Sequence, residues 1–372
     1  MLGFFKYYDF FLENINYVFT SSFSLLNLTL PLGISFITFQ KIAYLVDCKN
    51  KECTNKNPLT FLIFVSFFPQ LIAGPIVHHK EMMPQFEKSS YFSTDNFAKA
   101  LFLFSIGLLK KILVADTFGK YADAGFEASS LDLLSAWATS LSYTFELYFD
   151  FCAHTDMALA LALMFNIKLV QNFNSPYKAL NIQDFWHRWH MSLSRFLSRY
   201  IYIPLGGNRK GTRRTYLNLL IVFLIGGFWH GAGWSFIIWG ALHGFALIIH
   251  RIYQQLGFKM NKILAWFLCF NFVNLAWVFF RAPSLEKALN IIHSMFFAEL
   301  KLTWFFIQVK GSPRELLISL SLAFIICLFF KNSNEQIERF KPNLYAAFLI
   351  IVIFLYFFNS AFTPSKFIYF NF

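Results

Sequence analysis

Long apolar runs separated by short polar connectors dominate this chain of 372 residues. A helix needs about 20 mostly apolar residues to cross a bilayer, and roughly nine or ten segments between residues 22 and 361 reach or approach that length. No repeat period is visible, and no polar linker sets off a second soluble domain. The pattern therefore predicts an all-α polytopic membrane protein with a single domain over residues 1–372.

Several of these segments are irregular. Residues 1–20 mix aromatic and charged positions, which is typical of an interfacial or re-entrant piece. Residues 59–77 are long enough to span the membrane, but Pro69, Gly74 and Pro75 predict a bend or an end of that helix. Such breaks are tolerated where the backbone is buried in protein or lines a cavity. We therefore expect irregular backbone inside the membrane domain.

Charged residues interrupt two further segments. Lys110 and Lys111 close an apolar run and are expected to extend their ammonium groups toward the membrane surface. Residues 131–166 are long enough for two spans, with the sequence ELYFDFCAHTD between them. We interpret that stretch as a connecting loop at the membrane surface. The alternatives are a proton path or the polar wall of a tunnel, formed by Glu146, Asp150, His154 and Asp156.

Composition agrees with the hydrophobic pattern. Charged residues make up 14% of the chain, whereas a soluble domain has about 25%. The net charge is +12, but Lys and Arg gather in the cytoplasmic loops of membrane proteins. Because no nucleic-acid motif accompanies them, nucleic acid is excluded as a partner. Six Lys or Arg and no acid lie between Arg195 and Arg214, which predicts a cytoplasmic location for that stretch.

Two of the five cysteines, Cys48 and Cys53, share the basic loop DCKNKECTNKN. A pair with this spacing can form a disulfide or half of a metal site. The basic loop is expected in the cytoplasm, where disulfides are rare. We therefore predict that both thiols are free.

The segment 177–244 concentrates the candidate chemistry. It contains two Trp-His pairs, Trp189-His190 and Trp229-His230. An ionisable group in a membrane segment is costly and is by default a candidate for function. A dry pocket favours the neutral imidazole, which can act as a general base on a hydroxyl. The alternative is a histidine that only forms a hydrogen bond between helices, and for His243 both readings stay open.

Other histidines allow weaker readings. His187 and His190 are three residues apart, with Asp184 three residues earlier, so a helix would place them on one face. Such a set could bind zinc, and paired histidines can also bind haem. Neither HExxH nor CxxCH is present, so we predict no metal. We interpret the adjacent His78 and His79 as surface residues.

Capping and anchoring residues are predicted for the helix that begins at FWHRWH. Asn181 or Asp184 is expected to cap its N-terminus. Trp186 and Trp189 are expected to anchor it at the membrane interface. LGGNRKG further along is expected to form a turn, because it lacks the GxxxxGK[ST] pattern of a phosphate-binding loop.

The stretches FWHRWHMSLSRFLSRYIYIPLGGNRKG and GGFWHGAGWSFIIWGALHG resemble the membrane-bound O-acyltransferase (MBOAT) family. The resemblance is to its bacterial branch, the membrane components of alginate and peptidoglycan O-acetylation. It extends over residues 1–290 and includes LPLGISFITFQKIAYLVD, FFPQLIAGPIVHHKEMMPQF and WVFFRAPSLEKAL. DFCAHTDMA stands where relatives usually have a sequence like DFSGYSDMA. Relatives also carry hydrophobic segments before LGFFKYYDFF, so a short form or an incomplete gene product is expected.

The resemblance implies a fold and site residues. The fold is a ring of tilted transmembrane and re-entrant helices around a central tunnel. His230 matches the catalytic histidine of the family's WHG motif, and His190 matches the second essential histidine. Further tunnel or donor-binding candidates in the segment are His243, Trp189, Trp229, Asn181, Arg188, Arg195 and Asn208.

The resemblance also implies an activity. The expected enzyme resides in the bacterial inner membrane and moves an acetyl group from a cytoplasmic thioester, acetyl-CoA or another acyl thioester, to a cell-surface polysaccharide such as peptidoglycan or alginate. No bound cofactor is expected, and the implied partner is a periplasmic or extracellular acetyltransferase. The basic stretch from Arg195 to Arg214 is a candidate for attracting donor phosphates, or its charge only sets topology. A transporter or flippase for a lipid-linked glycan and a scaffold subunit without chemistry are the alternatives.

Overall fold

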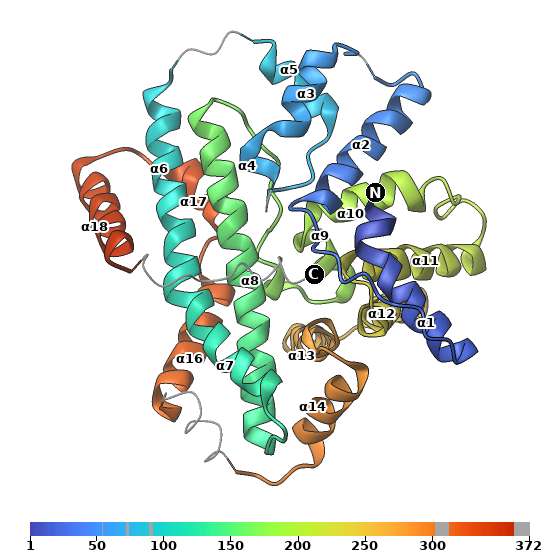
Figure 1. Cartoon of the computed structure of the whole chain (residues 1–372). Coiled ribbons are helices and arrows are strands. Elements are labelled where there is room, and N and C mark those ends of the chain that lie inside the picture. The colour runs from blue at the N-terminus through green and yellow to red at the C-terminus, as the bar shows by residue number, and fades with distance from the viewer. Residues whose placement is uncertain (54, 72–73, 89–91, 302–311, 361–372) are drawn as a thin grey trace.

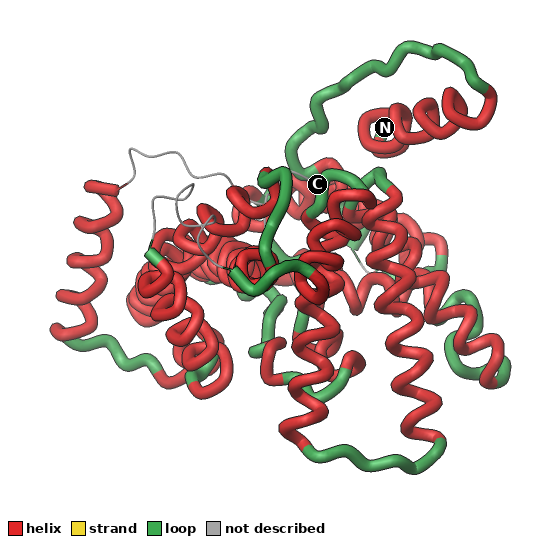
Figure 2. The backbone as a smooth tube through the Cα atoms, turned by 90° about the horizontal axis from the view of Figure 1, so that it is seen from below, coloured by secondary structure: helices red, strands yellow, loops and turns green. Residues whose placement is uncertain are grey.

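The computed structural model describes residues 1–53, 55–71, 74–88, 92–301 and 312–360. Most of these residues are helical, and no strand occurs among them (Figures 1 and 2). The predicted all-α class is therefore confirmed. A tunnel through the whole molecule stays a prediction.

The helices follow one another along the chain. They are η1 (Gly3–Tyr7), α1 (Tyr8–Phe19), α2 (Ile34–Lys49), α3 (Pro58–Ser66), α4 (Phe68–Leu71), α5 (His79–Phe86), α6 (Thr94–Leu109), η2 (Lys110–Ala115), α7 (Asp116–Glu127), α8 (Leu133–Met164), η3 (Pro176–Lys178), α9 (Ile182–Arg188), α10 (Met191–Leu197), η4 (Ser198–Tyr202), α11 (Thr212–His230), α12 (Trp234–Gln255), α13 (Lys262–Arg281), α14 (Leu285–Phe297), α16 (Pro313–Phe329), α17 (Ser333–Arg339) and α18 (Leu344–Ser360).

Three helices in the described part of the chain are long and apolar enough to cross a bilayer: α8, α12 and α13. The pair α16 and α17, bent by 59°, is a fourth if it counts as one span. The segment 59–77 is not one spanning helix. It is divided at Phe67, whose backbone is extended, into α3 and the single turn α4 with Pro69. The predicted break is confirmed, and it leaves two short pieces.

The central helix is α8, which has 32 residues and a length of about 48 Å. The Asp132 side chain caps it by accepting a hydrogen bond from the Ser135 N–H. Helices α6, η2 and α7 pack along α8, and α13 and α14 also contact it (Figure 1).

The predicted loop in residues 131–166 is wrong, because Glu146, Asp150 and Asp156 all lie within α8. Two lysines pair with Asp156 and Asp150. Lys110 Nζ lies 2.7 Å from Asp156 Oδ2, and Lys111 Nζ lies 2.7 Å from Asp150 Oδ1. The lysines therefore point into the protein instead of toward the membrane surface. A buried charge is costly unless it is paired and hydrogen-bonded, and these pairs let the helix continue.

Helices α11 and α12 form an antiparallel pair in contact through glycines (Figure 1). A Cβ on Gly227 would lie 2.3 Å from the Phe236 carbonyl oxygen, and one on Gly240 would lie 2.3 Å from the Phe223 carbonyl oxygen. Only glycine permits such close backbone approach. The pair holds His230, the last residue of α11, in a fixed place.

The N-terminal segment reaches this same place. Helix α1 lies at the edge of the molecule, followed by a long connection to α2 (Figure 2). Lys6 donates hydrogen bonds to the carbonyl oxygens of Trp229, at 2.7 Å, and His230, at 2.8 Å. A cation at a helix C-terminus satisfies carbonyl groups that have no partner within the helix. Residues 1–20 thus help to fix the end of α11.

Candidate functional site

His190 stands at a sharp break in the chain. Asn181 caps α9, as predicted, by accepting a hydrogen bond from the Asp184 N–H at 2.8 Å. The helix ends at Arg188, Trp189 is extended, and His190 has φ of 43° and ψ of 53°. This left-handed conformation is uncommon for a residue other than glycine. It turns the histidine inward, where its exposure is 1%.

Asn172 fixes the orientation of His190. Its Oδ1 lies 3.0 Å from His190 Nδ1 and accepts hydrogen bonds from the Ser192 hydroxyl and backbone N–H. Because a carbonyl oxygen can only accept, Nδ1 of His190 carries a proton, and the neutral ring has its lone pair on Nε2. Ser192 in turn accepts from the Ile76 N–H at 2.9 Å, which ties the AGPIV stretch to this site. Asn172 is a site residue that sequence reasoning missed.

The two Trp-His pairs meet in space. The ring centroids of His190 and His230 are 6.4 Å apart. Trp239 lies at 5.3 Å and Phe280 at 5.1 Å from the His230 ring, both edge to face. The two histidines come from segments forty residues apart, and aromatic side chains surround His230. A group held between them would be in a largely dry environment.

His243 packs between helices. Trp186 Nε1 donates a hydrogen bond to its Nδ1 at 3.2 Å, and its exposure is 0%. The Trp239 ring lies 4.8 Å away. His243 is not part of the cavity wall described next. Of the two interpretations that the sequence left open for His243, a functional group or a histidine packed between helices, the geometry favours the second.

A cavity of about 730 Å³ leads to His230. One face of α11 lines it with Leu219, Phe223, Gly226 and His230, and α12 contributes Trp239, Leu247 and Arg251; the remaining wall comes from residues 170–202. Its lining is largely apolar, with Arg195 and Arg251 as the cations. Apolar clefts with a few placed polar groups are the usual form of a small-molecule site.

Three other predicted site residues, Arg188, Arg195 and Asn208, do not contact the two histidines. Arg188 forms an ion pair with Asp184 at 2.8 Å. Arg195 lines the cavity but forms a two-pronged ion pair with Glu81, with nitrogen–oxygen distances of 2.5 and 2.9 Å. Asn208 is exposed in the predicted turn. None of the three reaches the pair of histidines.

The tryptophans predicted to anchor α9 at the membrane interface are buried instead. Trp186 is 8% exposed, Trp189 is 2% exposed, and both belong to the main core. Trp189 stacks on Phe185 at 5.6 Å. Trp229 is likewise buried, stacked on Phe39 at 4.8 Å. The interface prediction is therefore wrong for α9, because this short helix lies inside the protein.

The zinc reading of His187, His190 and Asp184 is also not supported. The helix ends before His190, so the three residues do not share a face. His187 is exposed at the cavity mouth, whereas His190 is buried and bonded to Asn172. Within the described residues these side chains do not form a ligand set.

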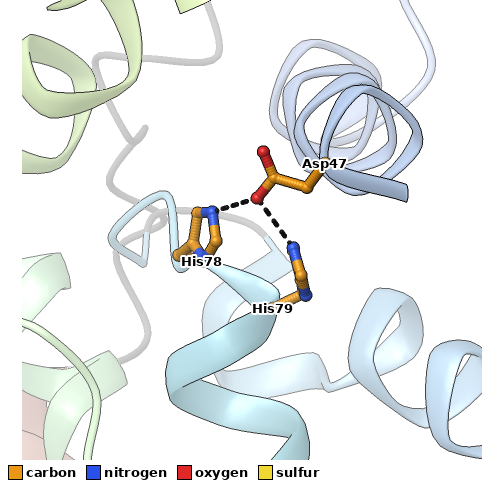
Figure 3. Close-up of side chains that lie close together, drawn as sticks. All are labelled: Asp47, His78 and His79. Atoms are coloured by element: carbon orange, nitrogen blue, oxygen red, sulfur yellow. Dashed lines mark hydrogen bonds and ion pairs between the residues drawn. The ribbon is translucent and has the colours of Figure 1, made fainter. Parts of the chain in front are cut away.

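His78 and His79, predicted to be surface residues, are drawn inward by a carboxylate (Figure 3). Nε2 of His78 lies 2.8 Å and Nε2 of His79 lies 2.9 Å from Asp47 Oδ2. Asp47 and His79 are buried. The surface prediction fails because Asp47, at the end of α2, supplies a buried acceptor for both rings. The cluster joins α2 to α5.

Hydrogen bonds hold this cluster together. Nδ1 of His78 accepts from the Lys80 N–H, so the neutral ring carries its proton on Nε2, which faces Asp47. Burial lowers the pKa of His78 to about 4. Burial alone would raise the pKa of Asp47, but the hydrogen bond from His79 and the charge of Arg199 hold it below its usual value. Cys48 and Cys53 close by are free thiols, as predicted.

Comparison with known proteins extends these findings. The model of MBOAT, the membrane-bound O-acyltransferase family, matches residues 50–285. A peptidoglycan O-acetyltransferase of Helicobacter pylori is 48% identical over 100% of this chain and 80% of its own length. A protein of Pseudomonas aeruginosa named "Probable alginate O-acetylase AlgI" is 39% identical over 92% of this chain and 67% of its own. A teichoic acid D-alanyltransferase of Bacillus subtilis is 27% identical over 64% of this chain and 62% of its own.

Fold and site define a class: an all-helical membrane protein in which one histidine lines an apolar cavity and a second histidine ring lies 6.4 Å from it. The chain belongs to the membrane-bound O-acyltransferase family. The prediction of an O-acyltransferase is thereby confirmed at the level of the enzyme class.

Proposed function

We propose that this protein transfers an acetyl group from a thioester to a hydroxyl group at His230, and that the cavity holds the donor. The observation that carries the proposal is the course of the cavity. It follows one face of α11 and ends at His230, which His190 faces at 6.4 Å. An apolar passage of this form suits a slender donor arm with its reactive carbonyl at the inner end.

The reaction moves one proton from the hydroxyl group to the leaving thiolate. The hydroxyl oxygen attacks the thioester carbonyl carbon, a carbon–oxygen bond forms, and the carbon–sulfur bond breaks. His230 takes the hydroxyl proton and delivers it to the departing thiolate, so that the products are an ester and a thiol. His190, with its proton on Nδ1 held by Asn172, orients the reacting groups from the other side. Aromatic walls exclude water that would hydrolyse the thioester.

Charge and the relatives support a membrane, a donor side and an acceptor for this reaction. The end of the cavity beside the basic stretch Arg195 to Arg214 is the donor side, in the cytoplasm, with acetyl-CoA as the donor. The membrane is the bacterial inner membrane. The acceptor is a cell-surface polysaccharide, with peptidoglycan favoured by the name of the 48% identical relative. A periplasmic or extracellular acetyltransferase is proposed as the partner that completes the transfer.

Purified protein in nanodiscs tests the proposal. With acetyl-CoA and a peptidoglycan fragment, or with the partner present, it should release free thiol and form acetate esters. A chain that moves a labelled lipid-linked glycan across vesicles without consuming thioester would be a transporter instead. A chain that does neither, yet is needed for acetylation by a partner, would be a scaffold.

A further inference from the structure

The cavity wall contains one cation whose role is not explained by packing or ion pairing. Arg251 lies near the end of α12 and lines the cavity. It makes no hydrogen bond or ion pair with any residue in the part of the chain that the structure describes. Its counterpart Arg195 is held by Glu81 through two contacts. An arginine without an acidic partner at a cavity wall is suited to bind an anion.

Arg251 sits at the opposite end of the cavity from the histidines. Along α12, the lining residues Trp239 and Arg251 are twelve positions apart, or about 18 Å at 1.5 Å per residue. Along α11, Leu219 and His230 are separated by about 16 Å. A hydrogen bond of 2.9 Å between Tyr216 and Gln255 fastens the two helices at the Arg251 end. The cavity therefore has one cationic end and one histidine end at a defined separation.

We infer that Arg251 binds the phosphate of a phosphopantetheine thioester. The inference rests on the proposed function and adds which part of the donor the protein recognises. A guanidinium group matches a phosphate with two parallel hydrogen bonds, and the apolar lining between the ends accommodates the pantetheine arm.

The dimensions agree with this ligand. About 13 bonds separate sulfur from phosphorus in a pantetheine arm, and at roughly 3.5 Å per three bonds an extended arm reaches about 15 Å. With the phosphate at Arg251, the thioester carbonyl arrives beside His230. Coenzyme A and an acyl carrier protein present the same phosphopantetheine group, so the chemistry is shared and the source is left to the experiment.

The test compares donors that differ only in the phosphate group. Acetyl-CoA, acetyl-phosphopantetheine and acetyl-pantetheine are supplied to wild type and to Arg251→Gln. The variant should raise KM for the two phosphate donors by about 10- to 100-fold, the equivalent of a hydrogen bond to a charged group worth about 1.5–3 kcal/mol. The kcat should change little, and acetyl-pantetheine should be used equally well by both proteins. An acetylated carrier protein forms a fourth arm that identifies the source.

Two further variants keep the test decisive. Lys259→Gln removes a cation from an exposed loop just beyond α12 and should behave as wild type. Arg251→Lys keeps the charge but not the paired hydrogen bonds, so its KM should lie between those of wild type and Arg251→Gln. An equal loss with acetyl-pantetheine, or no change with acetyl-CoA, would overturn the assignment of Arg251. A wild-type protein that uses none of the donors would overturn the proposed function, and the inference with it.

Discussion

At the scale of single residues, the site depends on how His190 is held. The ring sits in a left-handed backbone conformation and is fixed by a hydrogen bond to Asn172. Residues in sparsely populated backbone regions persist only where their surroundings determine them, and they gather at functional sites. The position of the His190 ring therefore depends on the side chain of Asn172.

This dependence gives a prediction for Asn172→Ala. Loss of the acceptor lets the His190 ring rotate or change tautomer, so acetyl transfer should fall about 10-fold or more. A double variant with His190→Ala should be little worse than His190→Ala alone, because residues that act as a unit are non-additive. Thiol release at matched protein levels measures both effects. Additive losses would show that Asn172 acts independently of His190. The control is Asn271→Ala, which removes a partly exposed amide that bonds only within its own helix.

Sequence patterns revealed the two histidines but not what surrounds them. The Trp-His pairs are visible because an ionisable group in apolar sequence is conspicuous. Asn172 is not visible, since it lies eighteen positions before His190 in a polar connector with other asparagines. Arg251 is equally hidden, because its lack of a partner is a property of the folded neighbourhood. Hydrophobic pattern shows what is buried, whereas orientation depends on contacts between distant segments.

At the scale of elements, the contact between α11 and α12 positions His230. The helices meet where Gly227 and Gly240 lie against backbone carbonyls of the opposite helix. Each such position is closed to any side chain unless the helices separate. The position of His230 is thus coupled to the spacing of α11 and α12.

Gly240→Ala tests this coupling. The added methyl group would lie 2.3 Å from the Phe223 carbonyl oxygen, and overpacking of this kind costs about 1–3 kcal/mol. We expect a lower melting temperature and reduced acetyl transfer. Gly233→Ala is the matched control, because its nearest contact would be an ordinary 3.7 Å. Unchanged melting and transfer in Gly240→Ala would show that the helices adjust freely.

The cluster of Asp47, His78 and His79 predicts a pH dependence of stability. The pKa of His78 is lowered to about 4 and that of Asp47 is also lowered. Groups with depressed folded-state pKa values stabilise the protein above their unfolded values, and this contribution is lost as pH falls. For His78 the loss begins below about pH 6.5 and continues toward pH 4.

The measurement is the melting temperature of the detergent-solubilised protein between pH 7.5 and pH 5. It should decrease with pH in wild type and decrease less in His78→Asn, which can still accept a hydrogen bond from the Lys80 N–H but does not titrate. Parallel curves for the two proteins would mean that His78 contributes nothing to the acid sensitivity.

Errors of sequence interpretation at this scale have a common physical origin. The acidic stretch from Glu146 to Asp156 resembles a loop because its charges look incompatible with a buried helix. Lys110 and Lys111, which lie in η2, pair with its Asp156 and Asp150. His78 and His79 look exposed for the same reason, since their acceptor Asp47 lies about thirty residues away in sequence. Partners that are distant in sequence allow polar side chains to be buried in the core.

At the scale of the whole molecule, orientation decides which side supplies the donor. The stretch from Arg195 to Arg214 is basic throughout, and the end of the cavity with Arg251 lies beside it, since Tyr216 near the start of α11 bonds to Gln255. In the proposed function, the positive-inside rule therefore assigns the donor end to the cytoplasm.

Asn208→Cys tests the orientation. Asn208 is exposed in the turn before α11, so a cysteine there should react with a membrane-impermeant thiol reagent only in inverted vesicles or opened cells. The five native cysteines are replaced first. Acetyl transfer by the resulting protein shows that its fold is kept. Labelling of intact cells from outside would reverse the topology and the proposed donor side.

The central claim is that His230 is the chemical centre of acyl transfer. The most direct measurement is thiol release from acetyl-CoA by His230→Ala, with His243→Ala as the matched buried histidine that lies outside the cavity wall. A general base contributes about 10²- to 10⁴-fold, so His230→Ala should lose transfer by at least that range while its membrane level and melting stay near wild type. His243→Ala should lose less activity. Near-normal transfer by a stably inserted His230→Ala protein would contradict the account.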